Sequence, residues 1–438
     1  MDFSSSVENN TRDFKITKSK PVLVHAEIKS RIPEYYYLSN LDQNLTSIMQ
    51  TVFCFKPDGD KKSTEGAGLV IREALAKVLV YFYPLAGNLT LGSDGKLVVK
   101  CTNRGVPFVE AGVDYDIAVL GNVTCLDCAM LSKLVHTDSA AKDMFETPLM
   151  TAQVTRFKCG GFVMGMTMNH CMADGISAME FVNSWSEIAR ALSPSIVPAI
   201  DRSVLKARQP PRITCEHNEF LEIKDISNIS AQYQESEMVY KAFNFDQEKL
   251  MRLKKLIMED GTIKNCSTFV ALTALVWRAR TKALEMKPDQ QLKLLFAVDG
   301  RSRLVNPPLP KGYFGNGIVL ACSVSNAGDL VNKPLSYAVQ LVQNAIKMVD
   351  DEFIRSAIDY LEVKKEKPSL SGTFLITTWT RLAFNTTDFG WGEPTQSGCV
   401  TLPEKEVALF LAGGGNGTTV LMGLPVNAMK SFQELMQI

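Results

Sequence analysis

The chain has 438 residues, of which 46% are hydrophobic and 21% are charged, and its 47 lysine and arginine residues balance 47 aspartate and glutamate residues. This neutral balance excludes the strongly basic surface of a typical nucleic-acid-binding protein and any general attraction to acidic membranes. The length predicts two domains of roughly 200 residues each, because a single core rarely grows beyond ~250–300 residues.

Neither a targeting segment nor a metal-binding pattern stands out in the sequence. Residues 1–6 are polar and lack the basic-then-apolar order of a secretory signal, and no apolar run approaches the ~20 residues of a membrane-spanning helix. Cys125 and Cys128 have zinc or redox spacing, but no second cysteine pair or histidine cluster completes four ligands. We therefore expect a cytoplasmic protein with reduced thiols, no metal site and no membrane span.

The first part of the chain alternates helix-like and strand-like segments. Apolar spacing predicts, in chain order, a helix over 69–83 that Pro84 ends, a turn over 85–88, a strand over 96–99, two paired strands over 153–157 and 162–168, and a helix over 178–188. Residues 192–220 then show no lasting period and contain four prolines, which indicates a long crossover. We expect an N-terminal domain over 1–192, a linker over 193–220 and a C-terminal domain over 221–438.

The second part of the chain has the same mixed character. We expect a helix over 250–257 with Lys254 and Lys255 on its basic flank, and a second helix that Ser267 or Thr268 caps. The other expected elements are a strand over 292–298, helical structure over 335–361, and a β-hairpin of 406–411 with 419–424. The glycine cluster at 413–417 lies inside this hairpin. No Lys-Ser/Thr pair follows it, so we interpret it as a turn and not as a phosphate loop.

The most informative segment is a His-x-x-x-Asp-Gly pattern formed by His170, Asp174 and Gly175 between a strand and a helix. The chain has only four histidines. A neutral imidazole at the mouth of an apolar strand can take a proton from a hydroxyl or amine that attacks a carbonyl. Asp174 could orient the ring as a triad carboxylate does, or turn away and hold the loop, and the spacing leaves both alternatives open.

Three other segments combine glycine with aromatic or charged residues. In 388–394, Trp391 lies between Gly390 and Gly392, which predicts a tight turn around an aromatic plug. The Tyr-Phe-Gly-Asn segment at 313–316 is similar in character. Arg301 follows the buried strand over 292–298, and an arginine in such a place is expected to pair with a carboxylate.

Together these motifs resemble those of the plant BAHD acyl-CoA-dependent acyltransferases, over essentially the whole chain. The paired motifs are 170–175 and the Asp-Phe-Gly-Trp-Gly turn at 388–392, and the lesser family motifs fall at 83–87, 299–301 and 313–316. The sequence departs from the family pattern at Asn88, where arginine usually follows Tyr-Pro-Leu-Ala-Gly.

The resemblance implies an α/β fold of two chloramphenicol-acetyltransferase-like domains, with mixed β-sheets flanked by helices and an active-site channel at the interface. Acyl-CoA would be a co-substrate, with no permanently bound cofactor. His170 would be the general base that activates an alcohol or amine for attack on the thioester in a ternary complex. Asp174 would be structural and paired with Arg301, and the Asp388 turn would lie away from the chemistry and support the CoA side.

The resemblance also suggests contacts for the substrates. Thr377 and Trp379 lie where related enzymes place a Thr-x-Trp segment, so they are candidates for the oxyanion and acyl pocket, although Trp379 could equally be a core residue. For CoA, Ser267 and Thr268 at a helix start could meet a phosphate, with Lys254 or Lys255 as the ion partner. The alternative for these four residues is a plain helix cap and a solvated basic face.

Longer segments narrow the choice of substrate class. Residues 38–43, 170–185 and 402–407 are similar to the ω-hydroxy-fatty-acid/fatty-alcohol hydroxycinnamoyltransferase branch, so we rank transfer of feruloyl or caffeoyl to a long-chain alcohol first. Neither Arg355 nor the Lys364-Lys365 pair is a clear handle for the carboxylate of an acceptor such as shikimate or quinate, which also favours the aliphatic alcohol. Another specialised-metabolite alcohol or amine, with an aromatic or short-chain acyl-CoA, ranks second.

Two other classes of protein compete with this interpretation. Peptide-synthetase condensation domains usually carry two adjacent histidines, where this chain has Asn169 and His170. Non-catalytic BAHD-like accessory proteins tend to lose the Asp-Phe-Gly-Trp-Gly turn, which is intact here. We therefore predict an enzyme, and expect a monomer that binds small molecules and no nucleic acid.

Overall fold

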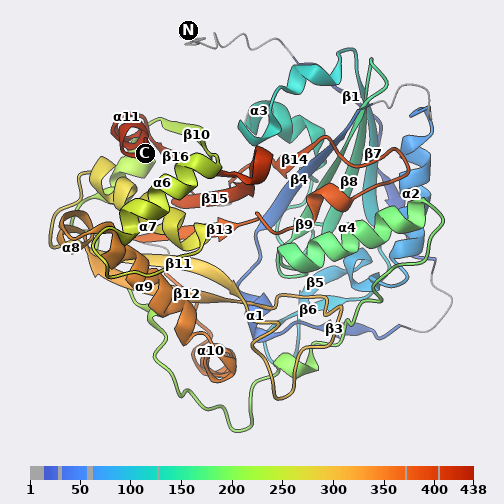
Figure 1. The fold of residues 1–438 in the computed structure, drawn as a ribbon. Coiled ribbons are helices and arrows are strands. Elements are labelled where there is room, and N and C mark those ends of the chain that lie inside the picture. Colours follow the sequence, from blue (N-terminus) through green and yellow to red (C-terminus); the bar gives the residue numbers. More distant parts are fainter. Residues whose placement is uncertain (1–13, 28–31, 57–62, 126–127, 370–371, 403–404) are drawn as a thin grey trace.

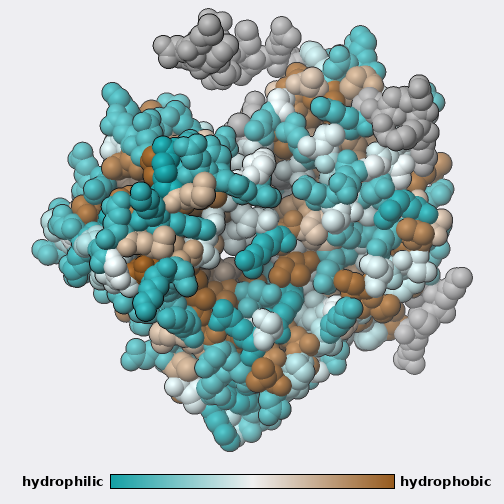
Figure 2. Space-filling view, viewed as in Figure 1, coloured by the Kyte–Doolittle hydropathy of each residue, from teal (hydrophilic) through white to brown (hydrophobic). Residues whose placement is uncertain are grey.

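The structure is a computed structural model that describes residues 14–27, 32–56, 63–125, 128–369, 372–402 and 405–438. Two large mixed β-sheets, flanked by helices, lie next to each other (Figure 1). This arrangement confirms the predicted α/β class with mixed sheets and helices on their faces. Figure 2 shows that hydrophilic side chains cover most of one face of the molecule and that this surface is hollowed where the two halves meet.

The first sheet has the strand order β1-β7-β8-β9-β4-β14, and β2 also pairs with β7. Its strands are β1 (Thr17–Lys18), β2 (Val22–Val24), β4 (Ile48–Phe55), β7 (Val106–Val113), β8 (Met150–Phe157), β9 (Phe162–Asn169) and β14 (Gln396–Cys399). The predicted pairing of β8 with β9 is confirmed and is antiparallel. Strand β14 comes from the second half of the sequence but pairs with β4, with Gln396 opposite Cys54.

The second sheet has the order β10-β16-β15-β13-β11-β12. Its strands are β10 (Met238–Phe245), β11 (Gln291–Asp299), β12 (Ile318–Asn326), β13 (Thr373–Thr378), β15 (Val407–Ala412) and β16 (Thr418–Pro425). The predicted hairpin is confirmed, because β15 and β16 pair antiparallel with Leu409 opposite Leu421. Strand β13 lies parallel to both β11 and β15, and this central position carries the candidate Thr377 at its end.

Helices cover the faces of both sheets. They are α1 (Asn40–Gln43), α2 (Ala67–Val78), α3 (Cys128–Leu131), α4 (Gly175–Ala189), α5 (Ile229–Glu235), α6 (Gln247–Met258), α7 (Thr268–Ala283), α8 (Ala327–Asn332), α9 (Leu335–Met348), α10 (Asp351–Lys364) and α11 (Val426–Leu435). On the first sheet, α2 and α4 contact each other (Figure 1), and the buried Trp185 indole donates to the Ile71 carbonyl at 2.8 Å. This contact fixes the helix that follows the His-x-x-x-Asp segment.

One predicted helix ends earlier in the structure, and one predicted helical run is confirmed but divided. The helix expected over 69–83 is α2, which ends at Val78, because the amides of Val80 and Tyr81 bond three residues back and Pro84 lies in a separate 3₁₀ turn. The helical run over 335–361 is two helices, α9 and α10, separated at Val349 and Asp350. Asp350 caps α10 through its side chain, which accepts from the Phe353 amide at 2.8 Å.

Several strands were not identified from the sequence, among them β4, β7, β10 and a strand that begins at the predicted turn over 85–88. Residues 85–88 were expected only as a turn, but β5 (Asn88–Leu91) begins at Asn88 and pairs with β6 (Leu97–Lys100), the strand predicted over 96–99. With β3 (Tyr35–Tyr37), these strands form a third, three-stranded sheet in the order β3-β6-β5. The asparagine that departs from the family pattern therefore starts a sheet strand.

Three further observations concern helix length, metal-ligating side chains and thiols. None of the described helices is long and apolar enough to cross a membrane. Within the same residues, no group of three or more histidine, cysteine, aspartate or glutamate side chains could hold a metal ion. Cys54, Cys171 and Cys399 are buried free thiols whose pKa burial raises to about 12. The predicted Cys125–Cys128 segment lies partly outside the described residues.

Candidate active site

His170 directly follows β9, a strand whose eight residues are all buried. Its backbone amide donates to the Ser47 carbonyl at 2.9 Å, which anchors it beside β4. The half-buried imidazole places Nδ1 3.1 Å from the Asn316 side-chain oxygen Oδ1. Asn316 precedes β12 of the second sheet, so the ring of His170 is held between the two halves of the molecule.

The hydrogen bonds of Asn316 define which ring nitrogen carries the proton when His170 is neutral. The Asn316 nitrogen Nδ2 donates to Asp42 Oδ1 at 2.8 Å and to the His170 carbonyl at 2.8 Å. Both partners can only accept, so the other amide atom, Oδ1, faces the ring. An oxygen acceptor there requires a proton on Nδ1. In the neutral ring Nε2 is then the unprotonated nitrogen, which is the state of a base.

Asp174 turns away from His170. Its Oδ2 accepts from Arg301 Nη1 at 2.8 Å and from the Gly317 amide at 2.9 Å, and its Oδ1 accepts from Arg301 Nη2 at 2.9 Å. Oδ1 also accepts from the Ser177 amide at 3.1 Å and so caps α4. The predicted ion pair with Arg301 is confirmed, and of the two alternatives for Asp174 the structure has the loop-holding one.

Glycines allow the two halves to approach at this point. A Cβ added to Gly175 would lie 2.7 Å from Leu382, a residue of the segment after β13. A Cβ on Gly317 would lie 2.8 Å from Arg301 Nη1 and would push the guanidinium away from Asp174. The glycine of the His-x-x-x-Asp-Gly pattern is therefore explained by close packing and not by an unusual backbone angle.

The Asp388 turn packs on the first sheet and on α4. Asp388 Oδ1 accepts from the amides of Gly390 at 2.7 Å and Gly392 at 2.9 Å, and both glycines have positive φ values, 103° and 84°. Trp391 packs edge-on against Phe162, with ring centroids 5.4 Å apart. The predicted tight turn with an aromatic plug is confirmed.

The two oxyanion candidates lie at the end of β13. Thr377 is the fifth residue of this strand and Trp379 follows it; both side chains are half-buried. The Trp379 ring packs against Phe384 at a centroid distance of 5.6 Å, and Phe384 packs against Phe53 of β4 at 5.6 Å. The segment after β13 therefore extends toward the half of the molecule that carries His170, as an oxyanion donor would need.

A model of the transferase family matches residues 14–438 of the chain. The chain belongs to this family, the BAHD acyltransferases. It is similar to two Arabidopsis thaliana proteins. One is omega-hydroxypalmitate O-feruloyl transferase, with 52% identity covering 98% of this chain and 96% of the relative. The other is fatty alcohol:caffeoyl-CoA acyltransferase, with 49% identity covering 97% and 98%. The protein is accordingly an acyl-CoA-dependent acyltransferase.

A solved structure has the same fold. The crystal structure of vinorine synthase aligns with a TM-score of 0.75 at 23% sequence identity, covering 95% of this chain and 96% of that one. At this identity the likeness concerns the fold alone. It confirms the two-domain architecture expected from the family resemblance.

Of the CoA candidates of this BAHD acyltransferase, Ser267 and Thr268 lie at the start of α7, and Lys254 and Lys255 lie on α6. Ser267 caps the helix by accepting from the Val270 amide at 3.2 Å, and Thr268 is the first helical residue. Burial raises the pKa of Cys266, next to this cap, and the positive charge of Lys254 opposes that shift. Lys254 is half-buried near the cap, whereas Lys255 is exposed. The predicted cap is confirmed; its contact with CoA stays a prediction.

Three residues around His170 were not identified from the sequence. Asn316 was seen only as part of the Tyr-Phe-Gly-Asn segment, and Asp42 only as part of the 38–43 resemblance. Arg202 lies in the stretch over 193–220 that was expected to be a linker between domains, and it is 1% exposed. A signal existed for Asp42, because Ser39 and Asp42 have the spacing of a helix capping box.

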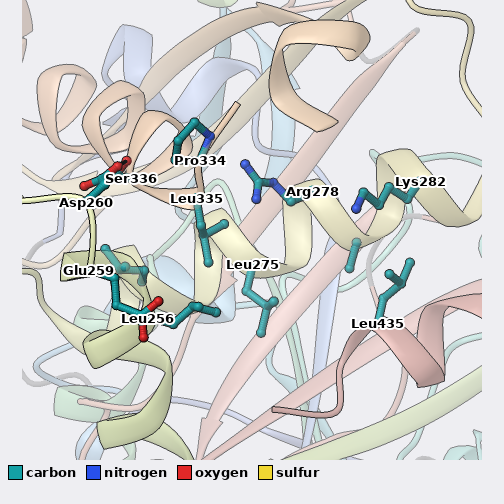
Figure 3. A pocket seen from close by; sticks show the side chains of 12 residues that line it. Leu256, Glu259, Asp260, Leu275, Arg278, Lys282, Pro334, Leu335, Ser336 and Leu435 are labelled. Carbon is teal, nitrogen blue, oxygen red and sulfur yellow. Dashed lines mark hydrogen bonds between the residues drawn. The ribbon is translucent and has the colours of Figure 1, made fainter. Parts of the chain in front are cut away.

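A cavity of about 360 Å³ lies elsewhere, between α6, α7 and α9 of the second half (Figure 3). Leucines and the charged residues Arg278, Lys282, Glu259 and Asp260 line it. The Arg278 Nε already donates to the Leu330 carbonyl at 2.9 Å. None of the residues around His170 lines this cavity, so it is separate from the candidate active site.

Proposed function

We propose that the enzyme transfers a hydroxycinnamoyl group, feruloyl or caffeoyl, from CoA to the hydroxyl of a long-chain aliphatic acceptor. The observation that carries the chemistry is the contact of His170 Nδ1 with Asn316 Oδ1, which leaves Nε2 as the basic nitrogen. The similarity to two fatty-chain hydroxycinnamoyltransferases over nearly the whole chain supports the choice of substrates.

The reaction follows from this arrangement. Nε2 of His170 takes the proton of the acceptor hydroxyl as its oxygen attacks the thioester carbonyl. The tetrahedral intermediate carries a negative oxygen, which Trp379 Nε1 and the Thr377 hydroxyl would stabilise. Its collapse breaks the carbon–sulfur bond and expels the CoA thiolate, which receives the proton from His170. No acyl-enzyme forms, so both substrates must be bound together.

The substrate assignment is tested by release of free CoA thiol from the purified enzyme. Feruloyl-, caffeoyl-, benzoyl- and acetyl-CoA are each combined with a 16-hydroxy fatty acid, a long primary alcohol, benzyl alcohol and an aliphatic amine. We expect the highest kcat/KM for a hydroxycinnamoyl-CoA with a long-chain hydroxyl acceptor. Preference for benzyl alcohol or for the amine contradicts the acceptor, preference for acetyl-CoA contradicts the donor, and no turnover with any pair contradicts the enzymatic role.

Trp379→Phe removes the indole N–H and keeps an aromatic ring in place. We expect kcat to fall about tenfold, the value of one ordinary hydrogen bond, because the half-buried position allows water to replace the donor. The KM for acyl-CoA should stay unchanged. Steady-state kinetics with feruloyl-CoA measures both values, and an unchanged kcat in the folded variant would assign Trp379 to the core alone.

Lys254→Ala tests the CoA site, with Lys255→Ala as its matched control one residue away. Loss of one partly screened ion contact to a phosphate should raise the KM for acyl-CoA about fivefold, or ~1 kcal/mol, without changing kcat. The effect should shrink at high salt. The exposed Lys255 should give a smaller change. Equal effects of the two substitutions would indicate a general basic face and not a specific contact.

A further inference from the structure

Arg202 is an arginine buried completely inside the molecule, although it comes from the crossover segment. Its Nη1 donates to the Cys171 carbonyl at 3.0 Å and its Nη2 to the Met172 carbonyl, so it binds the loop that directly follows His170. Its Nε donates to the Phe314 carbonyl at 3.2 Å. One guanidinium therefore joins the loop of the general base to the segment that leads into the second sheet.

The charge of Arg202 is balanced by Asp42, whose side chain is also fully buried. Asp42 Oδ2 lies 2.9 Å from Arg202 Nη1 and accepts from both the amide and the hydroxyl of Ser39, each at 2.6 Å. Asp42 Oδ1 accepts from the Asn316 backbone amide at 3.2 Å and from its Nδ2 at 2.8 Å. Burial alone would lower the pKa of Arg202, but Asp42 raises it above the usual arginine value.

Asp42 is one of two acceptors, with the His170 carbonyl, that determine which way the Asn316 amide faces. A carboxylate can only accept hydrogen bonds, so it holds Nδ2 on its own side and leaves Oδ1 toward His170 Nδ1. If the amide turned over, Nδ2 would donate to Nδ1. The proton of the neutral ring would then reside on Nε2, and the atom expected to accept the substrate proton would have no free lone pair.

We propose that Asp42, held by Arg202, is a positioning residue that keeps His170 in the tautomer able to act as a base. This proposal rests on the proposed role of His170 as the general base. Arg202 holds Asp42, Asp42 orients the Asn316 amide, and the amide oxygen accepts the hydrogen bond from Nδ1 of the imidazole. Neither charged residue contacts the reacting atoms.

A buried ion pair could instead serve stability alone, so the test needs a measurement that stability does not change. That measurement is the tautomer of His170, read from the ¹⁵N resonances of histidine-labelled enzyme at a pH where the ring is neutral. The chain has only four histidines, so the resonance missing from His170→Ala assigns the signal. The wild-type ring should carry its proton on Nδ1, and a proton on Nε2 would overturn the proposal without any further variant.

The double variant Asp42→Leu with Arg202→Met removes both charges and leaves neither one unpaired, which buried pairs commonly tolerate. We expect a mixture of tautomers at His170 and a kcat at least about tenfold lower, because general-base catalysis depends on the correct protonation state. The KM for both substrates should not change. Asp42→Asn, which nearly keeps the side-chain volume, should give the same direction of change.

The matched control is a buried ion pair of the second sheet, Arg280 with Glu406, whose side chains are 3% and 17% exposed. Arg280→Met with Glu406→Leu should change the unfolding midpoint but not the His170 tautomer. A wild-type tautomer and kcat in the folded Asp42 variants would overturn the proposal. If His170→Ala itself keeps its activity, the general-base assignment fails instead, so the two failures are distinguishable.

Discussion

Replacing His170 with alanine is expected to lower kcat for acyl transfer by about 10²–10⁴-fold, the usual contribution of a positioned general base. The variant lacks the imidazole whose Nε2 is the proposed base at the meeting of the two halves. The change should leave the fold intact, because the ring is half-buried and, among the described residues, its side-chain hydrogen bond is the one with Asn316. The KM for acyl-CoA should therefore remain close to the wild-type value.

The measurement is acceptor-dependent release of CoA thiol, compared with thermal unfolding of the same preparation. His25→Ala is the matched control. His25 is exposed, and its Nδ1 contacts only the Asn103 carbonyl, at 2.8 Å, among its hydrogen-bond partners in the described residues. The control should retain wild-type kcat. Full activity in folded His170→Ala would contradict the role of His170 as the base and therefore the proposed mechanism.

Asp174→Asn is expected to lower the free energy of unfolding by about 3–5 kcal/mol, the cost of breaking a buried ion pair from one side. The Asp174 side chain is 3% exposed and that of Arg301 is 17% exposed, so water screens the pair little. In either orientation the asparagine NH2 would also face a donor, the amide of Ser177 or that of Gly317. Activity should fall with the fraction of folded enzyme.

Asp299→Asn is the matched control for this change, because Asp299 pairs with the same arginine at 3.0 Å but is 42% exposed. Its loss should cost under about 1 kcal/mol. Urea unfolding measures both variants, and kcat is determined on the folded protein. An Asp174→Asn enzyme with wild-type stability and a lower kcat would show that the carboxylate takes part in the chemistry.

The sequence allowed much of the fold to be predicted where one local pattern dominates. The pairing of β8 with β9, the hairpin of β15 with β16 and the Ser267 cap were all predicted, because alternation, turn glycines and caps are local signals. The end of α2 and the break between α9 and α10 were not. The hydrogen-bond pattern changes at the end of α2, and the backbone is extended at Val349 and Asp350 between α9 and α10. Apolar spacing reveals neither feature.

The candidate site was predictable only in part. The paired motifs identified His170, and the family resemblance, not the spacing, indicated Arg301 as the partner of Asp174. The contacts of Asn316, Asp42 and Arg202 were not foreseen. These residues come from three separate segments, and one of them lies in a stretch whose prolines and lack of period suggested a linker between domains.

The sequence by itself thus determined the family and the class of reaction and indicated His170 as the candidate base, because each depends on short motifs that can be recognised along the chain. The tertiary structure decided which way Asp174 faces and which group contacts the His170 ring. The physical reason is that both depend on hydrogen bonds between residues more than a hundred positions apart. Asp174 binds Arg301, and His170 binds Asn316, only after the two sheets have come together. A buried charge takes the partner that the fold provides, and sequence spacing does not show which partner that is.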